Sequence, residues 1–261
     1  MENPKVSIIT SMFNSESYIE NFMKNVLSQD MFEDCELILI DANPSSEGAL
    51  VDGYLNKFIK KEYIFVNDGS SDRTLSIIKK KFQNNIKVKI VNYKKNMGKG
   101  YALKRGVQVA KNDWVLTTDA DCSVSNFQLT KWIRKKYLNQ NNFIYFGSRN
   151  HRLSIVKKKI ARQIVGMIFK FLIRFFFKIT ISDTQCGFKL YKLNTAKKIF
   201  KMISTNGYMH DIEICIIAKK LNFKIKDLPV NWTHVDQGKI NFVSDFFKIA
   251  FSLIKISRHN Y

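Results

Sequence analysis

Short apolar runs alternate with segments of helical spacing in the first part of the chain. Lys5–Thr10 (KVSIIT) is rich in β-branched residues, and Glu36–Ile40 (ELILI) is a second apolar run that ends at an aspartate. Between them, Glu16–Ser28 carries apolar residues three and four positions apart, as one face of a helix requires. Strands and helices that alternate at these lengths predict βαβ units and a mainly parallel sheet.

One strand-and-helix unit is present twice in this stretch. The first copy begins with ELILIDANPSSEG and continues as a helical pattern to about residue 60. The second copy begins with the strand Tyr63–Val66, passes through NDGSSDRT and ends near residue 82, so 63–82 looks like a repeat of 36–60. The repeat fits an ordinary extra βα unit of a larger sheet. It also fits a junction between two related sequences in which one copy is redundant, and both interpretations stay open.

The rest of the chain adds strands without a sign of a second domain. Lys87–Asn92, Asp113–Thr118 and Phe143–Phe146 are further strand-like runs. Proline is scarce, with 3 residues, and no run rich in glycine and serine interrupts the pattern. We therefore expect one α/β domain over 1–240, with a mostly parallel central sheet flanked by helices, and an amphipathic C-terminal helix over 241–261.

The chain is strongly basic. Lys and Arg number 43 against 22 Asp and Glu, which gives a formal net charge of +21 at pH 7. Such an excess indicates a polyanionic partner: a nucleic acid, an anionic membrane surface or a phosphorylated substrate. Part of the excess also fits the composition rich in Lys, Asn and Ile that an AT-rich genome produces.

Cysteine usage and the absence of targeting patterns indicate a reducing compartment. The 4 cysteines are far apart, with no C-x-x-C pair, which argues against a zinc site or a disulfide framework. The first strand-like run begins near residue 5, so we expect no signal peptide, and the sequence has no uncharged apolar stretch of about 18 residues. We expect a cytoplasmic protein that is associated peripherally with the inner membrane or the endoplasmic reticulum membrane.

The strongest candidate for chemistry is the sequence Asp119-Ala120-Asp121, directly after a buried strand. Open α/β sheets bind ligands at the carboxyl ends of their strands. Two carboxylates one residue apart can reach one Mg²⁺ or Mn²⁺ ion, which prefers such oxygens together with the phosphates of a ligand. Many surface turns contain D-x-D, and it is the position after VLTT that favours a metal site here.

Two further motifs follow strands. Asp68 in NDGSSDRT can accept a hydrogen bond from the imide N–H of a uracil, whereas the serines and Asp72 behind it can cap the next helix. Lys99 lies between two glycines at the start of a helical pattern, NMGKGYALKR. A loop of this kind suits a phosphate or ribose neighbour.

Taken in order, these motifs resemble those of the family 2 glycosyltransferases. VSIITSMFN, VNDGSSDRT and TTDADCS have counterparts in that family. Downstream, the motifs GSRNH, DTQCGFKLYK, HDIEI and VNWTHVDQGK are similar to those of the dolichyl-phosphate β-glucosyltransferase branch and its bacterial relatives. The resemblance covers 63–240 well and 1–45 as a generic start, and the doubled unit at 36–82 departs from it.

The resemblance implies a GT-A fold, which is Rossmann-like and binds nucleotide sugars. It implies inverting transfer of a sugar, most closely glucose, from UDP to a polyprenyl or dolichyl phosphate, with Mg²⁺ or Mn²⁺ as the cofactor. Asp68 would hold the base, Asp119 would lie by the ribose and the metal, and Asp121 would ligate the metal. Arg149 would face phosphate oxygens through its planar fork. The remaining residues assigned to the donor site are Ser11, Lys99 and Arg162.

Little further machinery is required. A phosphate acceptor is already anionic at neutral pH, so the enzyme must mainly hold two negative reactants together and stabilise the departing UDP. Asp183, ahead of CGFK, is the first candidate for a carboxylate near the acceptor, and Asp211 in HDIEI, where many relatives place a base, is the second. Asp183 can instead cap a turn, and Asp211 with Glu213 can instead begin a helix at its favourable end.

Two aromatic and basic segments suggest a membrane contact. Phe169–Phe177 and Phe242–Ile256 mix bulky apolar residues with Lys and Arg and are too charged to span a bilayer. They can lie in a bilayer interface with their cations toward anionic headgroups, or pack as amphipathic helices on the domain core.

Three rival functions differ in what they require. A saccharide acceptor would make Asp211 the essential base. A nucleotide-sugar-binding protein without turnover would result if the doubled unit spoiled the pocket. A nucleic-acid-binding module rests on charge alone, and because no motif supports it we expect no nucleic acid partner. The spacing of His151, His210 and His234 indicates no ligand role.

Overall fold

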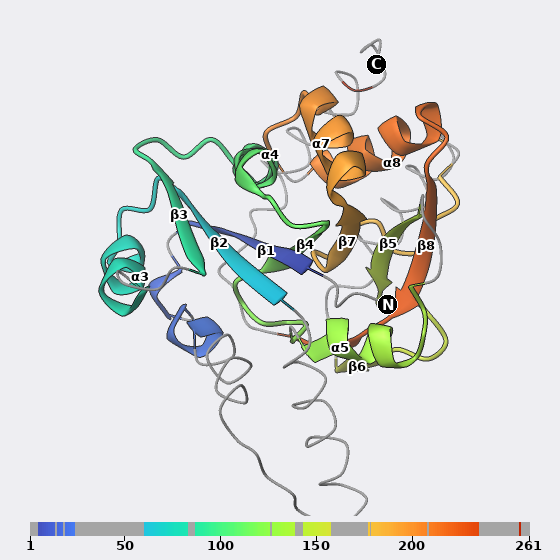
Figure 1. Cartoon of the computed structure of the whole chain (residues 1–261), viewed down its shortest axis with the longest axis horizontal. Coiled ribbons are helices and arrows are strands. Elements are labelled where there is room, and N and C mark those ends of the chain that lie inside the picture. Colours follow the sequence, from blue (N-terminus) through green and yellow to red (C-terminus); the bar gives the residue numbers. More distant parts are fainter. Residues whose placement is uncertain are drawn as a thin grey trace, which may run out of the picture.

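A computed structural model of the chain shows an α/β fold built on one twisted sheet (Figure 1). It describes residues 5–13, 15–17, 19–23, 60–82, 87–125, 127–138, 143–157, 177, 179–207, 209–234 and 256. Within these residues, seven strands form the main sheet in the order β3-β2-β1-β4-β7-β5-β8. The strands are β1 (Lys5–Met12), β2 (Lys60–Asp68), β3 (Val88–Tyr93), β4 (Trp114–Asp119), β5 (Phe143–Ser148), β7 (Lys189–Lys192) and β8 (Lys224–Pro229).

The sheet is mainly parallel, as the alternating pattern predicts. β1 pairs in parallel with β2 and β4, β2 with β3, and β5 with β8, whereas β7 runs antiparallel between β4 and β5. Six described strands therefore point the same way and end at one edge of the sheet, which we call the carboxyl edge. β7 begins at this edge, because it runs in the opposite direction.

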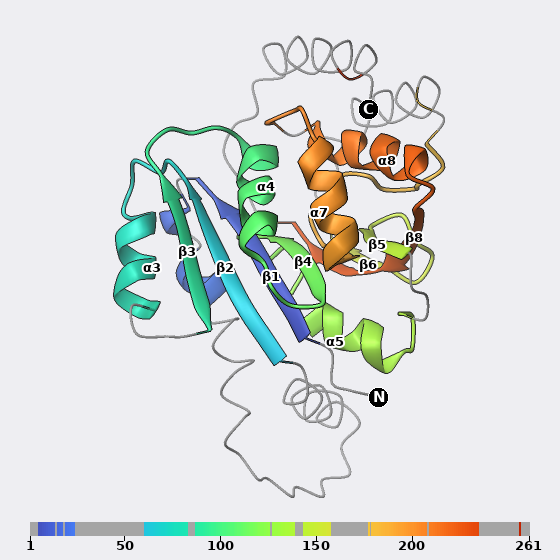
Figure 2. The ribbon, with the colours of Figure 1, turned by 45° about the horizontal axis from the view of Figure 1, so that its top comes forward.

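Helices cover both faces of the sheet (Figure 2). Successive side chains of a strand point to opposite faces, so a strand buried on both sides reads as a continuous apolar run. In β2, Ile64 and Val66 join the core under α4, α7 and α8, whereas Tyr63 and Phe65 join the core under α3 and α5. These helices are α3 (Thr74–Phe82), α4 (Lys99–Val109), α5 (Phe127–Arg134), α7 (Leu193–Met202) and α8 (His210–Lys220).

A second, small sheet lies beside the main one. It consists of β6 (Ile155–Lys157) and β9 (Asn231–Thr233), which pair in parallel. The described cysteines, Cys122, Cys186 and Cys215, are free thiols. Among the described residues no helix is both long enough and apolar enough to cross a bilayer.

The second copy of the doubled unit is part of the sheet and of its helical cover. It forms β2 and α3, with β2 beginning at Lys60, three residues before the predicted start. The first copy, at 36–59, lies outside the described residues. Arg162 and the aromatic, basic segments at 169–176 and 242–255 lie outside them as well, so their predicted roles stay predictions.

Candidate active site

The predicted site residues gather at the carboxyl edge. Asp68 ends β2 and Asp119 ends β4, while Arg149 directly follows β5. Ser11 lies beside Asp119 in the register of β1 and β4. Asp183 lies in the loop that leads into β7. This is the edge at which open α/β sheets bind their ligands.

Asp68 ties the glycine-rich loop to the end of β2. Its carboxylate is buried and accepts hydrogen bonds from the backbone N–H of Met97 at 2.7 Å and of Gly98 at 2.8 Å. The Asn96 side chain donates to the same carboxylate at 3.2 Å. Gly69 has a φ of 69°, and a Cβ on it would lie 2.5 Å from the Asn96 nitrogen. These contacts shape the loop, and the predicted contact of Asp68 with a base stays a prediction.

The glycine-rich loop binds another loop of the protein through its first helical amides. The N–H groups of Gly100 and Tyr101, in the first turn of α4, donate to the Asn206 carbonyl oxygen at 2.7 and 3.2 Å. A Cβ on Gly98 would lie only 2.5 Å from that oxygen. These two amides are therefore already used within the protein, and the expected phosphate or ribose neighbour of this loop stays a prediction. The glycines instead allow the loop around Asn206 to approach.

Lys99 connects this loop to the D-x-D turn. Its ammonium lies 2.5 Å from an Asp119 carboxylate oxygen, and the Asp119 side chain is 36% exposed. Asp121 accepts the Ser123 N–H at 2.9 Å. Burial and the neighbouring Asp119 charge raise the pKa of Asp121. A Cβ on Gly187, two residues before β7, would be 2.2 Å from an Asp119 carboxylate oxygen, so a side chain here would displace that carboxylate.

The donor atoms of this turn suit a hard divalent cation. No group of three or more His, Cys, Asp or Glu side chains placed to hold a metal occurs among the described residues. A cation here would therefore take the two carboxylates of Asp119 and Asp121 and complete its shell with oxygens from a ligand. Mg²⁺ is commonly held in this way, by one or two carboxylates and substrate phosphates.

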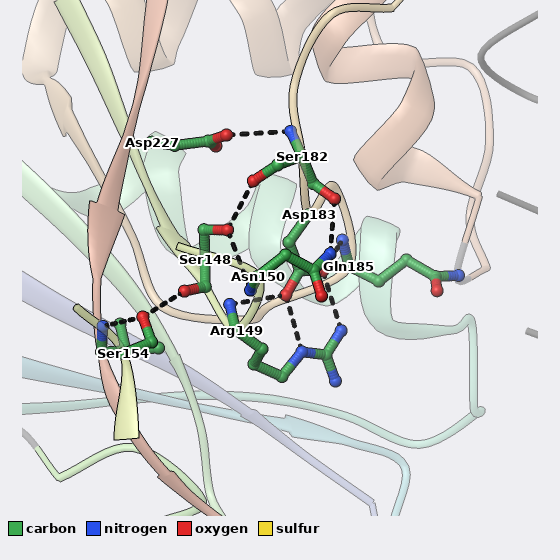
Figure 3. Close-up of polar contacts among 9 residues, drawn as sticks. Ser148, Arg149, Asn150, Ser154, Ser182, Asp183, Gln185 and Asp227 are labelled. Carbon is green, nitrogen blue, oxygen red and sulfur yellow. Dashed lines mark hydrogen bonds and ion pairs between the residues drawn. The ribbon is translucent and has the colours of Figure 1, made fainter. Parts of the chain in front are cut away.

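Arg149 and Asp183 form a bidentate pair (Figure 3). The Asp183 side chain is 0% exposed, and it accepts from Nε and Nη2 of Arg149 at 2.7 and 2.9 Å and from the Arg149 backbone N–H at 3.0 Å. The guanidinium also lies 5.6 Å from the centre of the Trp232 ring. Burial alone would lower the pKa of Arg149, but the hydrogen bonds to Asp183 outweigh it and raise the pKa. Asp183 thus orients the guanidinium of Arg149.

A network of hydrogen bonds holds the two loops of this pair together. Ser148 and Ser182 share a hydroxyl hydrogen bond of 2.6 Å, and the Asn150 side chain donates to the Ser182 carbonyl oxygen at 2.7 Å. The Ser182 N–H in turn donates to Asp227 of β8 at 2.8 Å. Figure 3 shows these residues around the Arg149–Asp183 pair. The motifs GSRNH and DTQCGFK, which are far apart in the sequence, therefore form one structural unit.

A buried charge cluster lies next to this unit, and two of its members, Lys189 and His210, were not predicted from the sequence. The Lys189 side chain is 2% exposed and its ammonium pairs with a carboxylate oxygen of Asp211. His210 places Nε2 at 3.1 Å from the same oxygen and Nδ1 at 2.8 Å from the Gly207 carbonyl. Both ring nitrogens of His210 therefore lie within hydrogen-bond distance of an oxygen.

Asp211 is held in its charged form by this cluster. Burial would raise the pKa of Asp211, but the positive charges of His210 and Lys189 outweigh burial and hold it well below its usual range. Lys189 also lies 4.6 Å from the centre of the Phe146 ring. The sequence does carry a signal for Lys189, which lies between apolar residues in a strand expected to be buried. Lysine is almost never fully buried unless it is paired, so this position indicates a buried acidic partner.

Comparison with known sequences gives concordant results. The model of glycosyl transferase family 2 matches residues 48–200. The chain is 33% identical over 218 residues to a dolichyl-phosphate beta-glucosyltransferase of Dictyostelium discoideum, covering 78% of this chain and 66% of that one. It is 31% identical over 223 residues to the enzyme of that name from Saccharomyces cerevisiae, covering 76% and 66%. The chain thus spans slightly less than two thirds of the length of these relatives.

Solved structures show the same fold at low sequence identity. Glucosyl-3-phosphoglycerate synthase of Mycobacterium tuberculosis in complex with UDP superposes with a TM-score of 0.65 at 14% identity, covering 98% of this chain and 82% of that one. Mannosyltransferase PcManGT of Pyrobaculum calidifontis, in complex with GDP-Man and Mn²⁺, gives 0.58 at 16% identity, covering 99% and 66%. The expected GT-A fold is thereby confirmed.

Proposed function

Because the chain belongs to glycosyltransferase family 2, we propose that it transfers glucose from UDP-glucose to a polyprenyl phosphate with inversion at the anomeric carbon. The names of the relatives from D. discoideum and S. cerevisiae support both the sugar and the class of acceptor. The proposal assigns the donor to the ends of β1, β2 and β4, and the acceptor to the loops after β5 and before β7.

On the donor side, Asp119 and Asp121 would hold Mg²⁺ or Mn²⁺ together with the diphosphate of the donor. When bound, the cation would act as a Lewis acid that stabilises the departing UDP. Lys99, whose ammonium already lies at Asp119, would contact the same phosphates, and Asp68 and Ser11 would lie near the nucleoside. The UDP bound to the M. tuberculosis synthase and the Mn²⁺ bound to the P. calidifontis mannosyltransferase support this assignment.

The main support for a phosphate acceptor is that neither acidic side chain near the proposed acceptor site is available as a general base. A hydroxyl acceptor needs a general base whose pKa lies near the working pH. Asp211 is buried with its pKa well below the usual range, and Asp183 is buried in a bidentate pair with Arg149. Neither is poised to take a proton. A phosphate acceptor needs no such base, because it is already anionic, and this favours a lipid phosphate over a saccharide.

Arg149 is the residue we propose for binding the acceptor phosphate. Its side chain is 23% exposed, and its pair with Asp183 uses Nε and Nη2, which leaves Nη1 to donate toward a ligand. Arginine suits phosphate because its guanidinium is planar and always charged. In this proposal Asp183 does not act as the base but fixes the direction in which Arg149 points.

A surface for the membrane lies near Arg149. The side chains of Leu153 and Ile155 are 58% and 60% exposed and follow Arg149 in the same loop and in β6. Arg152, directly before Leu153, is exposed as well, and three lysines follow at 157–159 in the sequence. Apolar side chains flanked by cations suit the interface of an anionic bilayer. We propose that this loop brings the site to the membrane that carries the acceptor.

The test is transfer of radiolabelled glucose from UDP-glucose to a polyprenyl phosphate in detergent, with Mg²⁺ or Mn²⁺ and again with EDTA. We expect metal-dependent label in the lipid phosphate, none with polyprenyl alcohol, and none with an Asp121→Ala variant. Label that enters only a saccharide acceptor would contradict the lipid phosphate. UDP binding without any transfer, to these or other acceptors, would indicate a protein that binds the donor without turnover.

A further inference from the structure

The loop between α7 and α8, residues 203–206, is held by a buried carboxylate. Glu213 of α8 is fully buried and accepts the Ser204 N–H at 2.6 Å and the Thr205 N–H at 2.9 Å. The Thr205 hydroxyl donates to the same carboxylate. Three donors meet two acceptor oxygens, so Glu213 fixes both the position and the orientation of this loop.

The same loop determines where α4 begins. The carbonyl oxygen of Asn206 accepts from Gly100 and Tyr101, and the Lys104 ammonium donates to the Ile203 carbonyl at 2.9 Å. The fit is close, because a Cβ on Gly100 would lie 2.7 Å from the Thr205 carbonyl oxygen. A small shift of the loop therefore has to move the first turn of α4 with it.

Lys99 is the first residue of that turn. Gly98 before it has a φ of 97° and Gly100 follows it. The backbone around Lys99 is therefore held by partners outside the loop, by Asp68 on one side and by the Asn206 carbonyl on the other. Its ammonium lies 2.5 Å from Asp119. The order of contacts thus runs from Glu213 through the loop and the start of α4 to Lys99.

We propose that Glu213 is a positioning residue of the donor site, which places the Lys99 ammonium beside Asp119 by holding the loop 203–206. The role of Lys99 toward a nucleoside diphosphate rests on the proposed function, but the positioning of Lys99 does not. A purely structural role for Glu213 would stabilise the fold and leave the environment of Lys99 unchanged. The two alternatives therefore predict different environments for the Lys99 ammonium when Glu213 is replaced.

The experiment compares Glu213→Gln and Thr205→Val with Ile217→Val in the full chain. The Gln side chain keeps the size of Glu but replaces one acceptor oxygen by a donor, and Val removes the Thr205 hydroxyl from the other side of the same contact. Ile217 is a buried apolar residue of the same helix, so its variant reports on lost stability alone.

The first readout is the rate at which Lys99 is acetylated by a small reagent, measured by mass spectrometry without any nucleotide. We expect both polar variants to raise this rate about fivefold, the change produced by losing one hydrogen bond of ordinary strength, and Ile217→Val to leave it unchanged. An unchanged rate in Glu213→Gln and Thr205→Val overturns the proposal, whatever the protein binds.

The second readout is UDP affinity by calorimetry with Mg²⁺. We expect Glu213→Gln to weaken UDP about fivefold, and to have no further effect in a Lys99→Ala background, because the two residues act in one chain of contacts. Additive losses would show that Glu213 acts elsewhere and would overturn the proposal. The wild-type chain could bind no UDP while both polar variants still raise the acetylation rate of Lys99. That result would refute the proposed function and support the positioning role.

Discussion

The proposed donor side and the proposed acceptor side of the carboxyl edge are built differently. On the donor side, short motifs at the ends of β2 and β4 supply the acidic groups, and Asp119 is 36% exposed. On the acceptor side, Asp183 and Lys189 are almost fully buried, and each is paired with a residue more than twenty positions away. Asp119 is thus partly accessible to a ligand, whereas Asp183 and Lys189 use their charges to hold the protein together.

This difference predicts different consequences of mutation. An exposed carboxylate can be lost with little effect on folding, because water solvates what remains. A buried charge that loses its partner is strongly destabilising, because no solvent replaces it. The donor side should therefore respond mainly in activity, and the acceptor side in both activity and stability.

The largest effect is expected for Asp119→Asn. It removes one of the two proposed carboxylate ligands of the divalent cation, and transfer should fall about 1000-fold, which corresponds to about 4 kcal/mol of transition-state stabilisation. The free energy of unfolding should change by less than about 1 kcal/mol, because the side chain is partly exposed. Asp113→Asn, at the amino end of the same strand, is the control and should keep its activity. A large loss of stability in Asp119→Asn would remove the contrast between the two sides.

Lys189→Met should have the largest effect on stability. It leaves Asp211 buried with His210 as its remaining cation, and the free energy of unfolding by urea should fall by about 3 kcal/mol. Adding Asp211→Asn should recover part of that loss, because the unpaired charge is then gone. Lys192→Met, on the same strand but only partly buried, should cost less than about 1 kcal/mol. Equal losses in the two lysine variants would argue against the cluster as a stabilising unit.

A smaller effect is expected for Arg149→Lys, which keeps the charge but loses the bidentate fork to Asp183. Transfer should fall about 30-fold, with a raised KM for the lipid phosphate. Asp183→Asn should act in the same direction, and the double variant should be no worse than the worse single variant, because the two residues act as one unit. A double variant that loses the product of the two single effects would support Asp183 as an independent catalytic group.

The smallest effect is expected at the exposed loop. Leu153→Ser combined with Ile155→Ser should weaken binding to phosphatidylglycerol vesicles about tenfold in a flotation assay, because only part of each side chain is available to enter the interface. Transfer to a short, water-soluble prenyl phosphate should not change. Val109→Ser, at the far end of α4, is the matched control. If the wild type, the double variant and the control bind the vesicles equally, the membrane contact lies elsewhere.

The sequence alone was sufficient for the fold and for the position of two acidic motifs at strand ends. Strand ends are marked by the change from apolar to acidic residues, and parallel strands must end at one edge, so the order of residues is enough to place Asp68 and Asp119 together. The sequence does not show, however, that the Asn206 carbonyl, about a hundred residues away, occupies the first amides of α4. A glycine-rich loop looks the same whether it receives a ligand or another loop.

The acceptor side depended on tertiary structure. Asp183 and Asp211 were identified as acidic candidates, but their partners Arg149, Lys189 and His210 decide whether they act as bases or as fixed charges. Local patterns determine which residues end a strand or begin a helix, because those preferences act over a few neighbouring positions. The state of a buried charge depends on solvent exclusion and on the charges within a few ångströms, and only the folded chain brings those groups together.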